Sequence, residues 1–145
     1  MTEIDKKLGE LVTIVKKLRS PDGCEWDKQQ THESLIPYLL EETYEVIEAI
    51  NDNDYKALKE ELGDLLLHVV FQAELANEKE QFSINDSICN VNNKLISRHP
   101  HIFNNSENDS YKKGNWELTK QKEKSRESIL DGVPISLPAL LKSRR

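Results

Sequence analysis

Two segments that are rich in both acidic and apolar residues, 38–50 and 55–68, constrain the fold of this chain more than any other feature. Each segment repeats its apolar residues at the three- and four-residue spacing of an amphipathic helix. Between them lies a polar stretch of Asn and Asp, residues 51–54, of the kind that ends helices and forms turns. The pattern predicts two antiparallel helices joined by a short turn.

Four carboxylates take mirrored positions on these two predicted helices. Glu42 and Glu45 share one face of the first helix, and Glu61 and Asp64 share one face of the second, because residues three apart project together. If the turn is centred on residue 53, Glu42 faces Asp64 and Glu45 faces Glu61. The two levels are then roughly 4.5 Å apart at 1.5 Å per residue. We therefore expect the four acids to converge on one patch.

A patch of this kind is unfavourable without a cation, because close carboxylates repel each other and raise each other's pKa. Hard oxygen ligands, without Cys and without a Glu-x-x-His repeat, favour Mg²⁺ or Mn²⁺ over zinc or a di-iron centre. The alternative is a solvated acidic helix face, but the mirrored spacing beside apolar runs favours a metal site. His68 is either a further ligand or a residue packed in the helix seam opposite Tyr38.

The chain has 145 residues, enough for one domain that buries a core without disulfides or structural zinc. Its cysteines, Cys24 and Cys89, are far apart and form no CxxC pair, which favours a reducing compartment. No apolar run approaches the roughly 18–20 residues of a membrane span, and the N-terminus lacks a signal-peptide pattern. We therefore expect a cytoplasmic protein that has no membrane partner.

The charges are unevenly distributed along the chain. A net charge of −6 argues against a nucleic-acid polymer as partner. Residues 33–64 hold ten acids and two bases, whereas residues 94–145 hold eleven bases and six acids. The first part is suited to bind cations and the second to bind anions. Lys94 and Arg98, four residues apart, would share a helix face, either to bind an anion or to stabilise a helix C-terminus.

Apolar residues recur at helical spacing almost throughout the chain, which predicts an all-α fold. The expected helices cover residues 3–19, Thr31 or Ser34 to about 50, 55–77, 83–98 and 116–130. Residues 1–130 would form a four-helix bundle-like domain with an additional C-terminal helix, followed by an arm or linker over 131–145. Residues 24–32 are predicted to be a loop, in which Trp26 either covers the core or provides a wall for stacking a planar ligand.

The acids form the signature E-E-x-x-E over residues 41–45, followed by E-x-x-D over residues 61–64. This signature is similar to that of the MazG family of all-α nucleoside triphosphate pyrophosphohydrolases. The resemblance covers about residues 8–141, including the stretches WDKQQTHESLIPYLLEETYEVIEAI, KEELGDLLLHVVF and NKLISRHPHIF. It is a resemblance to the N-terminal repeat of the longer family members.

The resemblance implies Mg²⁺-dependent hydrolysis of a nucleoside triphosphate between its α and β phosphates, which yields a monophosphate and diphosphate. It assigns the metal ligands to Glu42, Glu45, Glu61 and Asp64. It assigns nucleotide contacts to Lys94, Arg98 and Trp116, and we add Trp26 and Tyr38 as substrate-binding candidates. Glu41, turned about 100° away from Glu42 on the helix, is a candidate for activating water.

Two features separate the chain from the longer relatives. Glu25 stands where the family often has Pro, which affects the shape of the loop around Trp26. The chain also stops at Arg145, where those relatives continue into a second repeat. A non-catalytic dimerisation or nucleotide-sensing repeat is therefore the alternative function. In either case we expect a homodimer or higher homo-oligomer, with the apolar residues of 131–145 packed across a two-fold partner.

Overall fold

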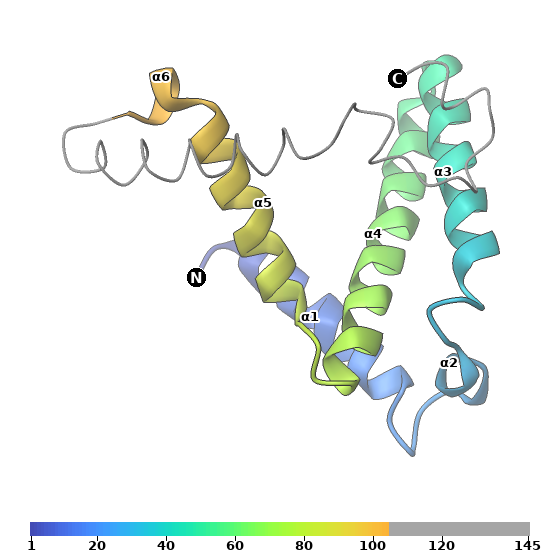
Figure 1. The fold of residues 1–145 in the computed structure, drawn as a ribbon. Coiled ribbons are helices and arrows are strands. Elements are labelled where there is room, and N and C mark those ends of the chain that lie inside the picture. The colour runs from blue at the N-terminus through green and yellow to red at the C-terminus, as the bar shows by residue number, and fades with distance from the viewer. Residues whose placement is uncertain (105–145) are drawn as a thin grey trace. The chain divides into compact units, whose positions relative to one another are not determined.

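The computed structural model describes residues 1–104 of the chain, which form helices and their connections (Figure 1). No strand occurs in this range, so the predicted all-α fold is confirmed for it. Residues 1–87 form one compact unit, and the residues from 88 onward belong to a second. The predicted helix over 116–130, which carries Trp116, and the arm over 131–145 lie outside the described residues. The helices are α1 (Glu3–Leu18), α2 (Glu25–Gln29), α3 (Ile36–Asn51), α4 (Tyr55–Glu78), α5 (Ile84–Arg98) and α6 (Pro100–Phe103).

Helix α1 begins at a capping box, in which Thr2 and Asp5 each satisfy a backbone N–H of the other. Its apolar stripe packs against α4, with Val15 fully buried. The stripe meets the larger core formed by Leu35 and by residues 70–75 of α4. The first predicted helix, over residues 3–19, is confirmed, and it ends one residue earlier, at Leu18.

Gly23 closes a tight turn after α1. A Cβ atom at this position would lie 2.1 Å from the carbonyl oxygen of Leu18 and 2.4 Å from that of Lys17. The adjacent Cys24 N–H donates to the Leu18 carbonyl oxygen at 2.9 Å, which holds the chain against the end of α1. Only a residue without a side chain fits here, so Gly23 sets the direction in which the chain leaves α1.

The segment between α1 and α3 differs from the prediction in two ways. Residues 24–32 were expected to be a loop, but residues 25–29 form the short helix α2. Neither Thr31 nor Ser34 caps α3, because their side chains bond to each other's backbone N–H instead, at 3.0 and 2.8 Å. The N-cap of α3 is Leu35, which makes no side-chain capping bond. Burial of Leu35 in the core accounts for this start, since its apolar side chain gains more there than a polar cap would.

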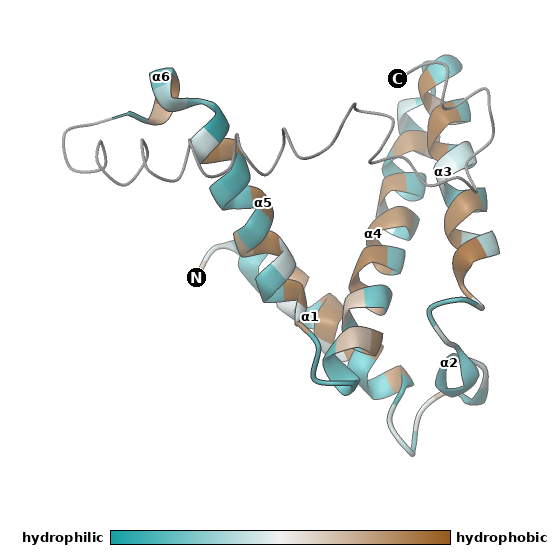
Figure 2. Ribbon diagram, in the orientation of Figure 1, coloured by the Kyte–Doolittle hydropathy of each residue, from teal (hydrophilic) through white to brown (hydrophobic). Residues whose placement is uncertain are grey.

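Helices α3 and α4 form the predicted antiparallel hairpin and lie side by side (Figure 1). Pro37 stands in the first turn of α3, where its missing N–H costs little. The turn places Asn53 in the left-handed region, with φ of 54°, a conformation that Asn tolerates better than most residues. Asp54 then caps α4 by accepting a hydrogen bond from the Ala57 N–H at 3.1 Å. Hydrophobic residues extend along most of both helices (Figure 2).

Two ion pairs join α1 to α4 beside the core. Lys16 Nζ lies 2.8 Å from Glu74 Oε2, and Arg19 Nε lies 2.6 Å from Glu78 Oε2. Glu74 is buried, so its charge depends on Lys16 for compensation. Among the described residues, no helix is both long and apolar enough to cross a membrane.

Helix α5 opens with the Ser83 and Asp86 side chains bonded to each other's backbone N–H, at 3.3 and 2.9 Å. It ends at Arg98, as predicted. The region from residue 99 was expected to be non-helical, but Pro100–Phe103 forms the short helix α6. Pro100 explains the restart, because proline at the first helical position has the right φ and needs no hydrogen-bond partner.

Candidate functional site

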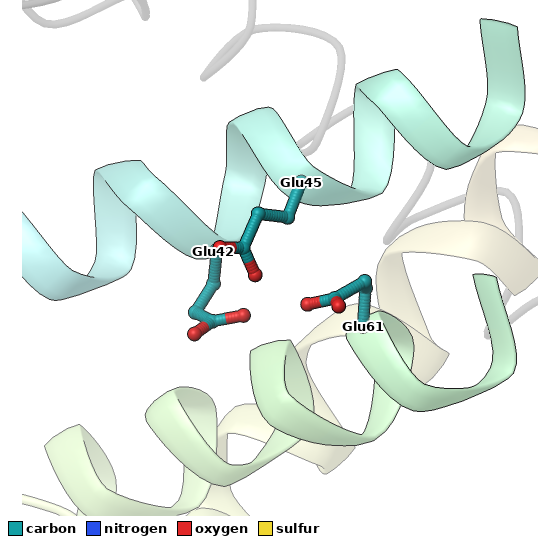
Figure 3. Close-up of side chains that lie close together, drawn as sticks. All are labelled: Glu42, Glu45 and Glu61. Atoms are coloured by element: carbon teal, nitrogen blue, oxygen red, sulfur yellow. The ribbon is translucent and has the colours of Figure 1, made fainter. Parts of the chain in front are cut away.

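The structure brings three of the four predicted acids together between α3 and α4. One carboxylate oxygen from each of Glu42, Glu45 and Glu61 lies within 4.8 Å of the other two (Figure 3). All three side chains are half-buried. The two glutamates of α3 stand one turn apart, and Glu61 of α4 points into the space between the helices towards them (Figure 3). Their close approach follows from the hairpin, whose short turn sets the register of the two helices.

Asp64 does not join this group of carboxylates. It is exposed, three residues after Glu61 on α4. Mirror symmetry about residue 53 pairs Asp64 with Glu42, but in the structure Glu61 is close to both glutamates of α3. The charge of Asp64 still acts on the cluster, because it is one of the causes that raise the pKa of Glu42. Its role as a fourth ligand remains a prediction.

Within the described part of the chain, the three glutamates affect one another's pKa as like charges in close contact do. A hydrogen bond with Glu45, followed by burial and the proximity of Glu42, raises the pKa of Glu61 to about 7. Burial is also the main reason why the pKa of Glu42 is raised, with the charges of Glu45 and Asp64 adding to it. Near neutral pH the cluster therefore retains a proton that a bound cation would displace.

Two oxygen atoms in the cluster fit a metal ion better than they fit a purely structural role. Glu42 Oε2 and Glu61 Oε2 are each buried and have no hydrogen-bond partner among residues 1–104. An unsatisfied buried oxygen costs stability, because it has lost its contacts with water and gained nothing in return. Carboxylate oxygens are the ligands that Mg²⁺ and Mn²⁺ prefer. The donor set thus fits a hard divalent cation.

His68 lies one turn beyond Asp64 on α4. Its Nδ1 atom is buried and finds no hydrogen-bond partner in the described part of the chain. Burial lowers the pKa of His68, against the opposing charge of Asp64, so the imidazole is neutral at pH 7. Within the described range His68 is not in the group of possible metal ligands. Of the two predicted roles, metal ligand and residue packed in the helix seam, its position favours the second.

An aromatic pair lies beyond the acids along α3. The rings of Trp26 and Tyr38 meet edge to face, with centroids 5.7 Å apart and an angle of 87° between planes. Both side chains are close to half-exposed, so neither is a core residue. Tyr38 precedes Glu42 by one helical turn, which puts them on the same face of α3, about 6 Å apart along its axis. The pair therefore offers aromatic surface near the carboxylate cluster.

Four further site residues were predicted from the sequence, namely Glu41, Lys94, Arg98 and Trp116. Glu41 is exposed and outside the cluster. Lys94 and Arg98 lie on the part of α5 that belongs to the second unit, and Trp116 lies outside the described residues. The roles of these residues in binding and catalysis remain predictions.

Comparison with known proteins agrees with the acid signature. A family model described as the MazG nucleotide pyrophosphohydrolase domain matches residues 30–103, which include the whole hairpin. A Thermotoga maritima protein named nucleoside triphosphate pyrophosphohydrolase/pyrophosphatase MazG is 53% identical over 138 residues, which cover 94% of this chain and 53% of the relative. An Escherichia coli K12 protein named nucleoside triphosphate pyrophosphohydrolase is 46% identical over 151 residues, which cover 100% of this chain and 56% of the relative.

More distant relatives have the same partial coverage. A Mycobacterium tuberculosis protein, also named nucleoside triphosphate pyrophosphohydrolase, is 39% identical over 138 residues, 93% of this chain and 42% of the relative. The chain thus spans about half the length of the curated relatives that it matches.

Proposed function

Because this chain belongs to the MazG nucleotide pyrophosphohydrolase domain family, we propose that it hydrolyses nucleoside triphosphates between the α and β phosphates, with Mg²⁺ as cofactor. The products are then a nucleoside monophosphate and diphosphate. The observation that carries the proposal is the convergence of Glu42, Glu45 and Glu61 from two helices onto one point. Three carboxylates at this distance repel one another, a bound cation would relieve this repulsion, and the same cation would attract the negative charge of a triphosphate.

Glu42, Glu45 and Glu61 would hold the ion, and Asp64 would complete the set from the next turn of α4. When bound, Mg²⁺ offsets the phosphate charge and orients the triphosphate for in-line attack by water. Mn²⁺ has the same ligand preference and is an alternative cofactor. Glu41 is the candidate for accepting the proton of the attacking water, because it is an exposed carboxylate next to a ligand in sequence.

The remaining contacts divide between phosphate and base. Lys94 and Arg98 are proposed to bind phosphate oxygens, since charge-assisted hydrogen bonds to phosphate are stronger than neutral ones. Trp26 and Tyr38 are proposed to contact the base, and their exposed ring surfaces on the same side of α3 as Glu42 support this. Trp116 is a further aromatic candidate for the nucleotide.

Product analysis tests the reaction directly. The full chain is incubated with each common nucleoside triphosphate and Mg²⁺, and the released phosphate species is identified by ³¹P NMR or ion chromatography. Diphosphate together with a nucleoside monophosphate is the expected result. Orthophosphate with a nucleoside diphosphate would show that a different bond is cleaved.

Matched variants of α3 link turnover to the acid cluster. Glu45→Gln should abolish turnover, because it removes one carboxylate charge from the cluster without changing the side-chain volume. Glu48→Gln is the control, since Glu48 is on the same helix, is exposed and is outside the cluster. Equal activity of the two variants would contradict the proposed metal site.

A non-catalytic repeat is the second candidate, because the chain corresponds to about half of its relatives. A repeat that only senses nucleotide or dimerises would show no turnover with any triphosphate. It would still bind a non-hydrolysable α,β-methylene triphosphate in a Mg²⁺-dependent way if it senses nucleotide. Binding and turnover are therefore measured on the same preparation.

We also propose a homo-oligomer, most simply a homodimer. Leu62, Leu66 and Val69 lie on one stripe of α4, and each is more than two-fifths exposed, which supports an apolar contact on this helix. The sequence predicts a different interface, formed by residues 131–145. Light scattering distinguishes these two interfaces. Leu66→Glu should dissociate an oligomer that is held by α4, and deletion of 131–145 should dissociate one that is held by the C-terminal residues. A monomeric full chain at micromolar concentration would contradict both.

A further inference from the structure

Helix α2, which carries Trp26, has few stabilising interactions of its own. It has five residues, none of them buried, and its N-cap Cys24 makes no side-chain capping bond. A helix of one and a half turns is unstable by itself, because nucleation is unfavourable and few hydrogen bonds follow it. The position of Trp26 must therefore come from contacts between this segment and the rest of its unit.

Arg19 supplies the strongest of these contacts. It stands at the C-cap of α1, and its side chain is only 11% exposed. Its Nη1 donates to two carbonyl oxygens at the end of α2, to Asp27 at 2.6 Å and to Gln30 at 3.3 Å. The Asp27 carbonyl oxygen also accepts the Gln30 N–H, at 3.4 Å, and Arg19 adds a charged donor at this helix end, where intrahelical donors run out. A guanidinium group is suited to these carbonyl oxygens, since it neutralises the negative end of the helix as it donates.

The other side of the same guanidinium group is fixed to α4. Nε and Nη2 donate to the two carboxylate oxygens of Glu78, at 2.6 and 2.8 Å. The group also lies over the ring of Phe71, 5.7 Å from its centroid, and Phe71 belongs to the buried core. Arg19 is thus held by α4 through a two-bond ion pair and a cation–π contact. Through Arg19, the end of α2 is connected to the buried core of the unit.

Trp26 lies next to the hydrogen bonds that join Arg19 to the end of α2. It immediately precedes Asp27, and its own carbonyl oxygen accepts a hydrogen bond from the Gln30 side chain at 2.8 Å. Of the two residues whose carbonyl oxygens bind Arg19, Asp27 is therefore adjacent to Trp26 in sequence and Gln30 is hydrogen-bonded to it. A displaced α2 would change the edge-to-face contact of Trp26 with Tyr38, one turn before the acids of the cluster.

We infer that Arg19 is a positioning residue for nucleotide binding, acting by fixing Trp26 in the orientation that receives the base. The inference rests on the proposed function, because it takes Trp26 as the base contact. Arg19 does not touch the nucleotide in this scheme. It differs from a residue that only stabilises the fold in that its loss changes the environment of Trp26 in the folded protein.

Fluorescence quenching of Trp26 gives a readout that does not depend on activity. The chain has two tryptophans, so Trp116→Phe leaves Trp26 as the only tryptophan, which is excited selectively at wavelengths where tyrosine does not absorb. In this background Arg19→Gln should increase acrylamide quenching by up to about twofold, because Trp26 is 48% exposed and release of α2 exposes the rest. Arg19→Lys, which keeps the charge but has a single donor group, should give a smaller increase and remain folded if Arg19→Gln does not.

Nucleotide affinity is measured in the background that retains Trp116, with an α,β-methylene triphosphate and Mg²⁺. Loss of one base-stacking contact weakens binding by about 5- to 150-fold, so Arg19→Gln should weaken it by up to this factor. Turnover at saturating nucleotide should change much less. Mg²⁺ affinity without nucleotide should not change, because the acid cluster is untouched.

Lys16→Met is the matched control. It removes the other ion pair between α1 and α4, that of Lys16 with Glu74, but has no contact with α2. It should lower the melting temperature while Trp26 quenching and nucleotide affinity stay as in the parent. Unchanged quenching in Arg19→Gln, or affinity that falls with stability equally in Arg19→Gln and Lys16→Met, overturns the inference.

Trp26→Ala separates the inference from the proposed function. If Trp26→Ala leaves nucleotide affinity unchanged, the base contact is wrong and the positioning role fails with it, even though Arg19 still fixes α2. If Trp26→Ala weakens binding and Arg19→Gln does not, the base contact stands and only the role of Arg19 is wrong. Weakened binding in both variants, with increased Trp26 quenching in Arg19→Gln, is the expected result.

Discussion

Lowering the pH from 8 to 6 should weaken Mg²⁺ binding by this chain, and Glu61 should be the main cause. Its contacts with Glu45 and Glu42 raise its pKa to about 7, so the free cluster takes up a proton within this pH range. In the proposed metal site Mg²⁺ would bind the ionised carboxylate, so each ion that enters would displace this proton. Affinity therefore rises with pH and levels off above the pKa of Glu61.

The size of the effect follows from the fraction of protonated Glu61. With a pKa of about 7, the apparent Mg²⁺ affinity falls about twofold at pH 7 and about elevenfold at pH 6, relative to the fully ionised cluster. Binding at pH 7 then releases about half a proton per ion from Glu61. The pKa of Glu42 is also raised, mainly by burial, so protonation of this residue acts in the same direction as the pH falls.

Isothermal titration calorimetry in buffers of different ionisation enthalpy measures both the apparent Mg²⁺ affinity and the number of protons released per ion, on the nucleotide-free chain. Glu61→Gln should bind Mg²⁺ more weakly and lose most of the pH dependence. Glu48→Gln, an exposed acid on α3, should behave as the parent protein. A proton release near zero at pH 7, together with an affinity that is constant between pH 6 and 8, would refute the assignment of the proton to a metal-binding carboxylate.

Three further predictions concern stability. Without metal, Glu61→Gln should raise the melting temperature above pH 7 and have no effect below about pH 4, because the folded-state pKa is raised from 4.5 to about 7 and the stability that this gives is lost as the pH rises between these two values; an equal effect at both pH values would contradict this. Gly23→Ala should lower the melting temperature, since its Cβ would overlap the Leu18 carbonyl oxygen, and a neutral result would place the turn elsewhere. Leu75→Ala should lower the free energy of unfolding by about 2–5 kcal/mol in urea denaturation, whereas Ile4→Ala, 75% exposed, should change it by less than about 0.5 kcal/mol.

The hairpin and the acids on it could be predicted from sequence because both depend on local patterns. The polar stretch 51–54 specified the turn, and helical spacing then determined which acids share a face. That Glu45 and Glu61 approach each other followed from counting residues outward from the turn. The position of Asp64 did not follow, since counting ignores the rotation of each helix about its own axis. This rotation is set by packing of the apolar residues.

The segment around Trp26 could not be predicted for a different reason. Residues 24–32 carry no apolar period, and α2 is held by partners that are distant in sequence. Arg19 meets Glu78 across 59 positions, and His32 bonds with Gln72 across 40. No local pattern relates residues so far apart. Leu35 likewise begins α3 because the folded core accommodates it, although Ser34 and Thr31 are better capping residues.

The short turn of the hairpin also affects how the site forms during folding. The three clustered glutamates fall between residues 42 and 61, so a single turn brings them together. Contacts this close in sequence cost little chain entropy and form on the microsecond scale of local elements. The repulsion between the glutamates opposes closure of the hairpin at that same early stage. If the cluster binds Mg²⁺ as proposed, the ion present during refolding would remove this repulsion, and the rate of folding, as well as the final stability, should then depend on the metal ion.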